Sequence, residues 1–275
     1  MPIVAAATIL TIVPAHADPF TVTYEAAGVQ NTTASFDYVG VENFDGLTTG
    51  TGESFTTSYG TTASSAYQMS GAYSGVQINA ADQYGGAGGT GKYAVTFSSA
   101  GYTLMLSSTN TTTGLAAPID YFGFWLSALD AGNQVSFYKG TTLVYSFSPA
   151  DVDALLGSQS AYLGNPNAPF KGYNKDQPYV FLNFYDTAGS FNKIVFSESP
   201  ADGGYESDNQ TVGYYTDQTG TVVPEPGSVA LFGVGVVGLG FMWTRRHSKN
   251  ASVFHLTDDA FTEAHPTWAV SGALY

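Results

Sequence analysis

Short runs of Val, Phe, Tyr and Thr recur along the chain, separated by Gly, Asn and Asp at intervals of roughly eight to twelve residues. This spacing is typical of sandwiches and barrels, because a helix needs a longer periodic segment. We therefore predict an all-β fold, an antiparallel β-sandwich of the jelly-roll kind. The expected strands are Phe20–Tyr24, Ser35–Val39, Tyr93–Phe97, Tyr102–Ser107, Tyr121–Leu126, Val135–Tyr138, Leu143–Phe147, Tyr179–Tyr185 and Asn192–Ser197.

Local patterns refine this outline. Val135–Phe147 reads as a hairpin with its turn at Lys139-Gly140-Thr141, and Tyr121–Leu126 is apolar on both faces, which predicts a strand near the middle of a sheet. Ser148, Pro149 and Gly157 punctuate one short helix. The Gly, Ser and Thr-rich stretch 46–91 is expected to hold long loops.

The two ends of the chain differ from the middle. An apolar run, Ile3–Val13, is followed by Ala15-His16-Ala17, which predicts a signal peptide over residues 1–17. Near the other end, Gly227–Trp243 spans 17 uncharged residues and is followed by Arg245 and Arg246. A helix of that length nearly matches a bilayer core, and the basic pair predicts a cytoplasmic C-terminal side.

Composition of the middle region excludes several functions. The chain has no cysteine, and its histidines are His16, His247, His255 and His265, so a domain over 18–222 has neither residue. Cys-His dyads, Ser-His-Asp triads and His-ligated zinc are excluded there. That domain has eighteen acidic side chains, five lysines and no arginine, a formal charge of −13, which repels nucleic acid.

The order Pro224-Glu225-Pro226, apolar span, Arg245-Arg246 resembles the PEP-CTERM signal of exosortase-processed bacterial surface proteins. The resemblance implies sorting over residues 223–246, recognition of the Pro-Glu-Pro element by a membrane-embedded protease, membrane anchoring, and a place in an extracellular matrix or biofilm. The same type of segment is also described as the C-terminal domain of ice-binding proteins. The chain departs from the pattern by a further tail, 247–275, expected to be cytoplasmic and disordered.

Residues 121–212 also resemble exosortase-dependent surface domains with a lectin-like sandwich. The matching segments are Phe122-Gly123-Phe124 leading to Leu129-Asp130, the hairpin through Val135-Ser136-Phe137-Tyr138, Val180–Phe184, Phe191–Phe196 and Glu206-Ser207-Asp208-Asn209. This resemblance implies the sandwich fold and places an acidic and Asn pair near the final strand. The alternative for Asp208 and Asn209 is that they form an ordinary turn.

Calcium is the ion that such carboxylates suit, since it binds six to eight oxygens in irregular geometry. One acidic cluster lies early in the domain and one near its end, and the first and last strands of a jelly roll often lie side by side. We therefore predict a structural calcium site made of Glu42, Asp45, Glu206, Asp208 and Asn209.

Two functions remain open. The leading hypothesis is a non-enzymatic surface protein, structural or adhesive, with extracellular polysaccharide as a partner that stacks on tyrosines. Tyr59, Tyr67, Tyr73 and Tyr84 are the candidates, and the alternative is that they pack at the edge of the fold. The rival function is a secreted polysaccharide-active enzyme that uses paired carboxylates.

Overall fold

The computed structural model describes residues 20–60, 66–117, 119–148, 152, 156, 159–187, 189, 191–201 and 203–222. Within these ranges the regular secondary structure is almost entirely β-strand, with two short 3-10 helices. The strands are β1 Phe20–Tyr24, β2 Ser35–Glu42, β3 Gly50–Ser58, β4 Tyr67–Ala80, β5 Lys92–Thr96, β6 Tyr102–Asn110, β7 Tyr121–Ser127, β8 Asn133–Lys139, β9 Thr142–Phe147, β10 Val180–Asp186, β11 Lys193–Glu198, β12 Tyr205–Asp217 and β13 Thr221–Val222, and the helices are η1 Ala87–Gly89 and η2 Ser160–Tyr162.

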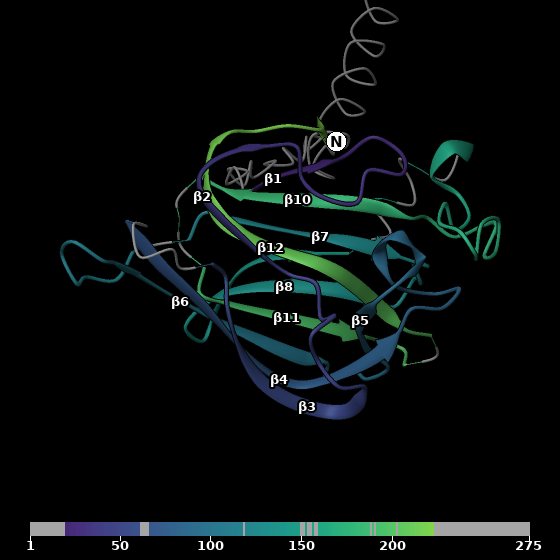
Figure 1. Ribbon diagram of the computed structural model, residues 1–275, viewed down its shortest axis with the longest axis horizontal. Coiled ribbons are helices and arrows are strands. Elements are labelled where there is room, and N and C mark those ends of the chain that lie inside the picture. Colours follow the sequence, from purple (N-terminus) through teal and green to yellow (C-terminus); the bar gives the residue numbers. More distant parts are fainter. Residues whose placement is uncertain are drawn as a thin grey trace, which may run out of the picture. The chain divides into compact units, whose positions relative to one another are not determined.

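All thirteen strands described belong to one antiparallel sheet that curls around the main core, and Trp125, Ala128, Tyr179 and Phe181 form a second, smaller buried cluster (Figure 1). Its order is β13-β1-β10-β7-β12-β5-β4-β6-β11-β8-β9, with β2 also paired to β12 and β3 to β4. The two longest strands make the curl possible. One end of β12 pairs with β5 and the other with β2, while β4 pairs with both β5 and β6, so each passes from one side of the fold to the other.

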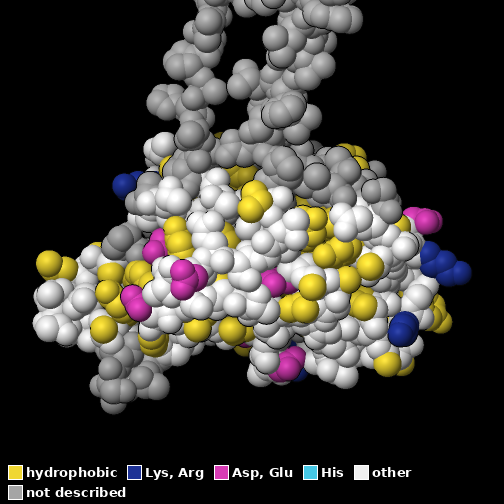
Figure 2. Space-filling view, turned by 90° about the horizontal axis from the view of Figure 1, so that it is seen from above, with side chains coloured by type: hydrophobic (Ala, Val, Ile, Leu, Met, Phe, Trp, Pro, Cys, Tyr) yellow, Lys and Arg dark blue, Asp and Glu magenta, His cyan; other side chains and the backbone are white. Residues whose placement is uncertain are grey.

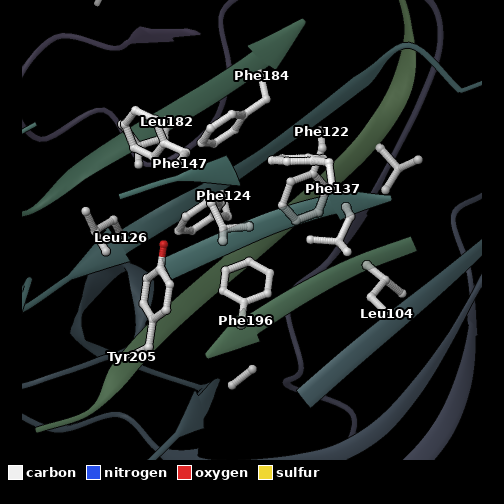
Figure 3. Packing of buried hydrophobic residues seen from close by; sticks show 14 of the residues in the cluster. Leu104, Phe122, Phe124, Leu126, Phe137, Phe147, Leu182, Phe184, Phe196 and Tyr205 are labelled. Carbon is white, nitrogen blue, oxygen red and sulfur yellow. The ribbon is translucent and has the colours of Figure 1, made fainter. Parts of the chain in front are cut away.

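The core between the two sides is built largely of aromatic rings (Figure 3). Phe124, Phe196 and Tyr205 contact one another, with ring centroids 5.0 to 6.1 Å apart. Phe137 and Phe184, whose centroids are 5.1 Å apart, extend the cluster. Edge-to-face and offset ring pairs of this kind add to the stabilisation from buried apolar area.

A polar network lies inside this apolar core. The Tyr59 and Tyr73 hydroxyls are 2.6 Å apart, Tyr73 donates to Gln210 Oε1, and Gln210 Nε2 donates to Tyr102 and Ser207. Because Tyr73 uses its proton on Gln210, Tyr59 must donate to Tyr73. Burial raises the pKa of Tyr59, Tyr73 and Tyr102, so their hydroxyls stay protonated and can donate.

Most of the expected elements are confirmed. Each of the nine predicted strands overlaps one in the structure, and all seven residues of β7 are buried, as expected for a strand covered on both faces. The predicted hairpin is the β8–β9 pair, in which Gly140 turns with φ of 61°. The antiparallel all-β class is therefore correct, although the strands form one curled sheet.

The prediction of long loops over 46–91 was wrong for most of the stretch. It holds β3 and β4, which pair along most of β3, while residues 81–91, with η1, do form a loop. Ser, Thr and Gly obscured the alternation in β4, where Met69, Gly71, Tyr73, Val76 and Ile78 are the buried positions. The outer face of β4 is polar and needs no apolar residues, so composition alone suggested a loop.

Other predicted segments are seen in part or lie outside the described residues. Val152 and Leu156, from the expected short helix, are helical and buried in the core. The predicted signal peptide, the sorting segment 223–246 and the tail 247–275 lie outside the described residues.

Gly40 offers a test of the β2 packing. A Cβ at this position would meet backbone atoms of Tyr59, which cannot rotate away. We expect Gly40→Ala to lower the free energy of unfolding by about 1–3 kcal/mol, the usual cost of overpacking. Denaturant unfolding measures this. Gly46→Ala is the matched control, because nothing lies within 4 Å of its Cβ position, and an equal loss in both variants would contradict the packing described.

Candidate functional site

The acidic residues near the end of the domain lie within strand β12. Tyr205 faces the core, and Ser207 contacts the core residue Tyr102 with 2.8 Å between their hydroxyl oxygens. Because side chains alternate along a strand, Glu206 and Asp208 point to the opposite face of the sheet. Both are buried all the same, with exposed fractions of 4% and 3%.

Asp208 accepts hydrogen bonds from two backbone segments. Its Oδ2 accepts the Ala87 amide at 2.7 Å, and its Oδ1 accepts the Asn209 amide at 2.6 Å. Burial raises the pKa of Asp208 to about 7, and the charges of Asp45 and Glu42 add to the rise against the lowering effect of the two amides. The side chain is therefore a buried carboxylate that titrates near neutral pH.

The early acidic cluster lies beside this part of β12. Glu42 is opposite Gln210 in the β2–β12 pairing, so the two sequence clusters do come together as predicted. Glu42 Oε1 accepts the Phe44 amide at 2.7 Å, and Asp45 Oδ1 accepts the Lys92 amide at 2.8 Å. Backbone amides thus occupy oxygens of both side chains.

The remaining two predicted ligands, Asn209 and Glu206, lie in different surroundings. Asn209 has φ of 48°, in the left-handed region that Asn tolerates, and its Nδ2 donates to the Gln30 carbonyl at 3.0 Å. Glu206 lies near two other acidic residues, Asp130 and Glu198. Burial is the largest cause that raises the pKa of Glu206, and the charges of Asp130 and Glu198 raise it further. Glu42, Asp45, Asp208 and Asn209 are therefore neighbours, whereas Glu206 belongs to a second cluster.

That second cluster was not among the predicted sites. Asp130 lies in the loop after β7 and Glu198 is the last residue of β11, and both accept hydrogen bonds from the Gly203-Gly204 turn before β12. The sequence signal was weak, since Asp130 and Glu198 are 68 residues apart and only the fold joins them. Across the described ranges, no three acidic or histidine side chains are grouped as they would be around a metal ion.

The predicted sugar-stacking tyrosines are mostly interior. Tyr59 and Tyr73 are buried in the core, Tyr67 packs on Tyr214 with ring centroids 4.4 Å apart, and Tyr84 is 44% exposed. Sequence reasoning missed Tyr173, which is 55% exposed. It lies in an open pocket of about 420 Å³ lined by Lys171, Gly172, Tyr173, Asn174 and Lys175.

Hydrogen bonds hold this pocket in a defined shape. The Gln83 carbonyl accepts Asn174 Nδ2 at 2.7 Å, the Tyr179 hydroxyl at 2.7 Å and Asn165 Nδ2 at 3.1 Å. The Asn165 amide in turn donates to the Tyr173 carbonyl at 2.8 Å. The loop that presents Tyr173 is thereby tied to the neighbouring loop that carries Tyr84.

Comparison with known families identifies one segment. Residues 222–246 match the PEP-CTERM protein-sorting motif. This match confirms the resemblance of Pro224, Glu225, Pro226, Arg245 and Arg246 to that signal. The motif indicates an exported protein that exosortase processes and sorts to the cell surface. No curated protein and no solved structure matches the chain.

Membrane attachment rests on this motif. None of the helices in the described part of the chain is long and apolar enough to cross a membrane. The predicted span, Gly227–Trp243, lies outside the described residues.

Proposed function

We propose that the exported domain is a structural or adhesive, non-enzymatic component of the cell surface or extracellular matrix, and that it binds polysaccharide. The sorting motif supports the location. The observation that supports binding is the pocket at Tyr173, where an exposed ring and two exposed lysines stand on a hydrogen-bonded loop. A sugar ring stacks on such a phenol, and the ammonium groups donate to its hydroxyl or carboxylate oxygens.

The charge distribution is compatible with this role. On the face shown in Figure 2, acidic side chains lie singly among uncharged ones, and lysines lie toward the edge. The chain carries a formal charge of −14, which opposes general attraction of acidic polymers. Binding therefore depends on a local contact such as the Tyr173 pocket.

The enzymatic alternative has one observation in its favour, since Glu206 and Asp208 lie two residues apart on one face of β12. A glycosidase needs two carboxylates a few ångströms apart that its substrate can reach. Glu206 and Asp208 are covered, and Asp208 already binds two backbone amides. We therefore favour binding without turnover.

Replacing Tyr173 by alanine tests the binding surface. We expect roughly three- to tenfold weaker retention on immobilised cell-surface polysaccharide, corresponding to the usual 0.5–1.5 kcal/mol for an aromatic contact. Leu115→Ala is the control, because Leu115 is 68% exposed and its truncation also removes surface apolar area. If Tyr173→Ala is retained as strongly as the native chain, this pocket is not the binding surface. Release of sugar fragments would favour the enzymatic alternative.

Calcium at Glu42, Asp45, Glu206, Asp208 and Asn209 stays a prediction as a structural cofactor. The proximity of the first two to Asp208 supports it, and the amides bound to those carboxylates weigh against it. An ion there would have to share these oxygens with backbone donors.

A further inference from the structure

Two loops close one end of the core. The first, 128–132, connects β7 to β8, and the second, 199–204, connects β11 to β12. They contact each other through a hydrogen bond of 2.8 Å from the Ser199 amide to the Gly132 carbonyl. Asp130, on the first loop, and Glu198, at the last residue of β11, lie where these loops meet.

Both carboxylates point at the same turn. Glu198 Oε1 accepts the Gly203 amide at 2.8 Å, and Asp130 Oδ2 accepts the Gly204 amide at 3.2 Å. A Cβ on Gly203 would meet Asp130 Oδ2 and would lie 2.9 Å from Glu198 Oε1. The two oxygens therefore converge on one small volume, and Glu198 is completely buried there.

Asn133 brings a neutral oxygen to the same place. It lies directly opposite Glu198 in the β8–β11 pairing, so both side chains project from the same face of the sheet. That face is the inner one, because Val135 and Phe196, each two residues away on its strand and so on the same face, are core residues. Asn133 is 1% exposed, yet neither its Oδ1 nor its Nδ2 has a hydrogen-bond partner.

A buried amide without partners is rare, because a polar atom that is removed from water and gains no hydrogen bond destabilises the fold. Beside it stand two acidic side chains that accept hydrogen bonds from uncharged groups, including Gln177 Nε2, 3.3 Å from Asp130 Oδ1. A divalent cation would give Asn133 Oδ1 the partner it lacks, because such an ion binds an amide oxygen and carboxylates together.

We propose that Asp130, Glu198 and the Asn133 amide oxygen form a binding site for a divalent cation, calcium by its preference for oxygen ligands. The site contains two carboxylates, so water and backbone carbonyls would complete the shell. Glu206 is a further acidic neighbour of this cluster. This site is separate from the one predicted at Asp208, and it does not depend on the proposed polysaccharide binding.

Asn133→Asp distinguishes a cation site from an unusual polar contact, because the expected effect changes sign. Without calcium, a third carboxylate adds repulsion, so the melting temperature of the variant should fall below that of the native chain. With calcium, the extra charge should tighten binding by on the order of tenfold. The measurement is thermal unfolding of the full-length chain in detergent, with chelator, with excess calcium, and with magnesium at matched ionic strength.

For the native chain, calcium at a hundred times Kd should raise the melting temperature by about 5 to 10 °C over chelator. Asp130→Asn should lose most of that rise, and because Asp130 is only partly buried, this variant tests the site even if Asn133→Asp fails to fold. Asp217→Asn, at an exposed position, is the matched control and should keep the rise, and Asp208→Asn reports whether the ion binds at the site predicted from sequence instead.

Three results would overturn the proposal. The first is that calcium raises the native melting temperature no more than magnesium does. The second is that Asn133→Asp is destabilised equally with chelator and with calcium. The third is that Asp208→Asn loses the rise while Asp130→Asn keeps it, which would place the ion at the site predicted from sequence.

Discussion

A chain with Glu225→Ala is expected to accumulate uncut in the membrane, with the cleaved extracellular form reduced at least tenfold. The Pro-Glu-Pro element lies in the matched sorting motif, immediately before the apolar span. A protease that reads this element must discriminate by direct contacts, and a site built around a charged side chain strongly rejects an analogue that lacks it. Without cleavage the 17-residue span keeps the chain anchored.

The measurements are the intact mass of the protein recovered from cells and the fraction of it that is found in the membrane. Asp217→Ala is the matched control, since it removes the same charge from an exposed position eight residues earlier, outside the motif. Processing should be unchanged in that variant. Normal cleavage of Glu225→Ala, or extracellular protein with the span still attached, would contradict processing at this motif.

The fold could be predicted where the strands were rich in apolar residues. Strands such as Tyr121–Ser127 and Val180–Asp186 are mostly aromatic and aliphatic, and burial on both faces follows from that composition. β4 could not be predicted, because its outer face is Ser, Gly and Gln. β12 was hidden for another reason: its charged and amide residues are typical of turns, and only the pairing with β2, β5 and β7 makes them a strand.

The candidate sites also differ in how far the sequence could predict them. That Glu42 and Asp208 would be neighbours followed from the expected meeting of the first and last strands, and the β2–β12 pairing brings them together. Gln210 directly follows the predicted ligand Asn209 in the sequence, but a bulge in β12 turns it into the core, where it bonds three hydroxyls. The sequence alone could not show that Asp130 and Asn133 lie near Glu198, because this follows from the β8–β11 pairing, which places Asn133 opposite Glu198.

The native chain is expected to lose stability as the pH rises from about 4 to 7, with Asp208 contributing about 2–4 kcal/mol. The pKa of Asp208 is about 7 in the folded chain and ordinarily about 4 when unfolded. Because the folded state then binds more protons than the unfolded state, stability falls with pH over that interval and levels off above it. Each pKa unit corresponds to about 1.4 kcal/mol, and relaxation of the site lowers the total.

Asp208→Asn should flatten this part of the pH profile, because amide nitrogen and oxygen do not titrate. The free energy of unfolding of this variant at a single pH is less informative than the slope, because one of the two backbone amides that Asp208 binds would face the NH₂ group of the asparagine. Denaturant unfolding at pH 4 to 8 with chelator measures the slope. Asp176→Asn, at an exposed position, controls for the lost charge and should keep the native slope. Equal slopes in the native chain and Asp208→Asn would show that Asp208 ionises normally and that its burial does not hold it near neutrality.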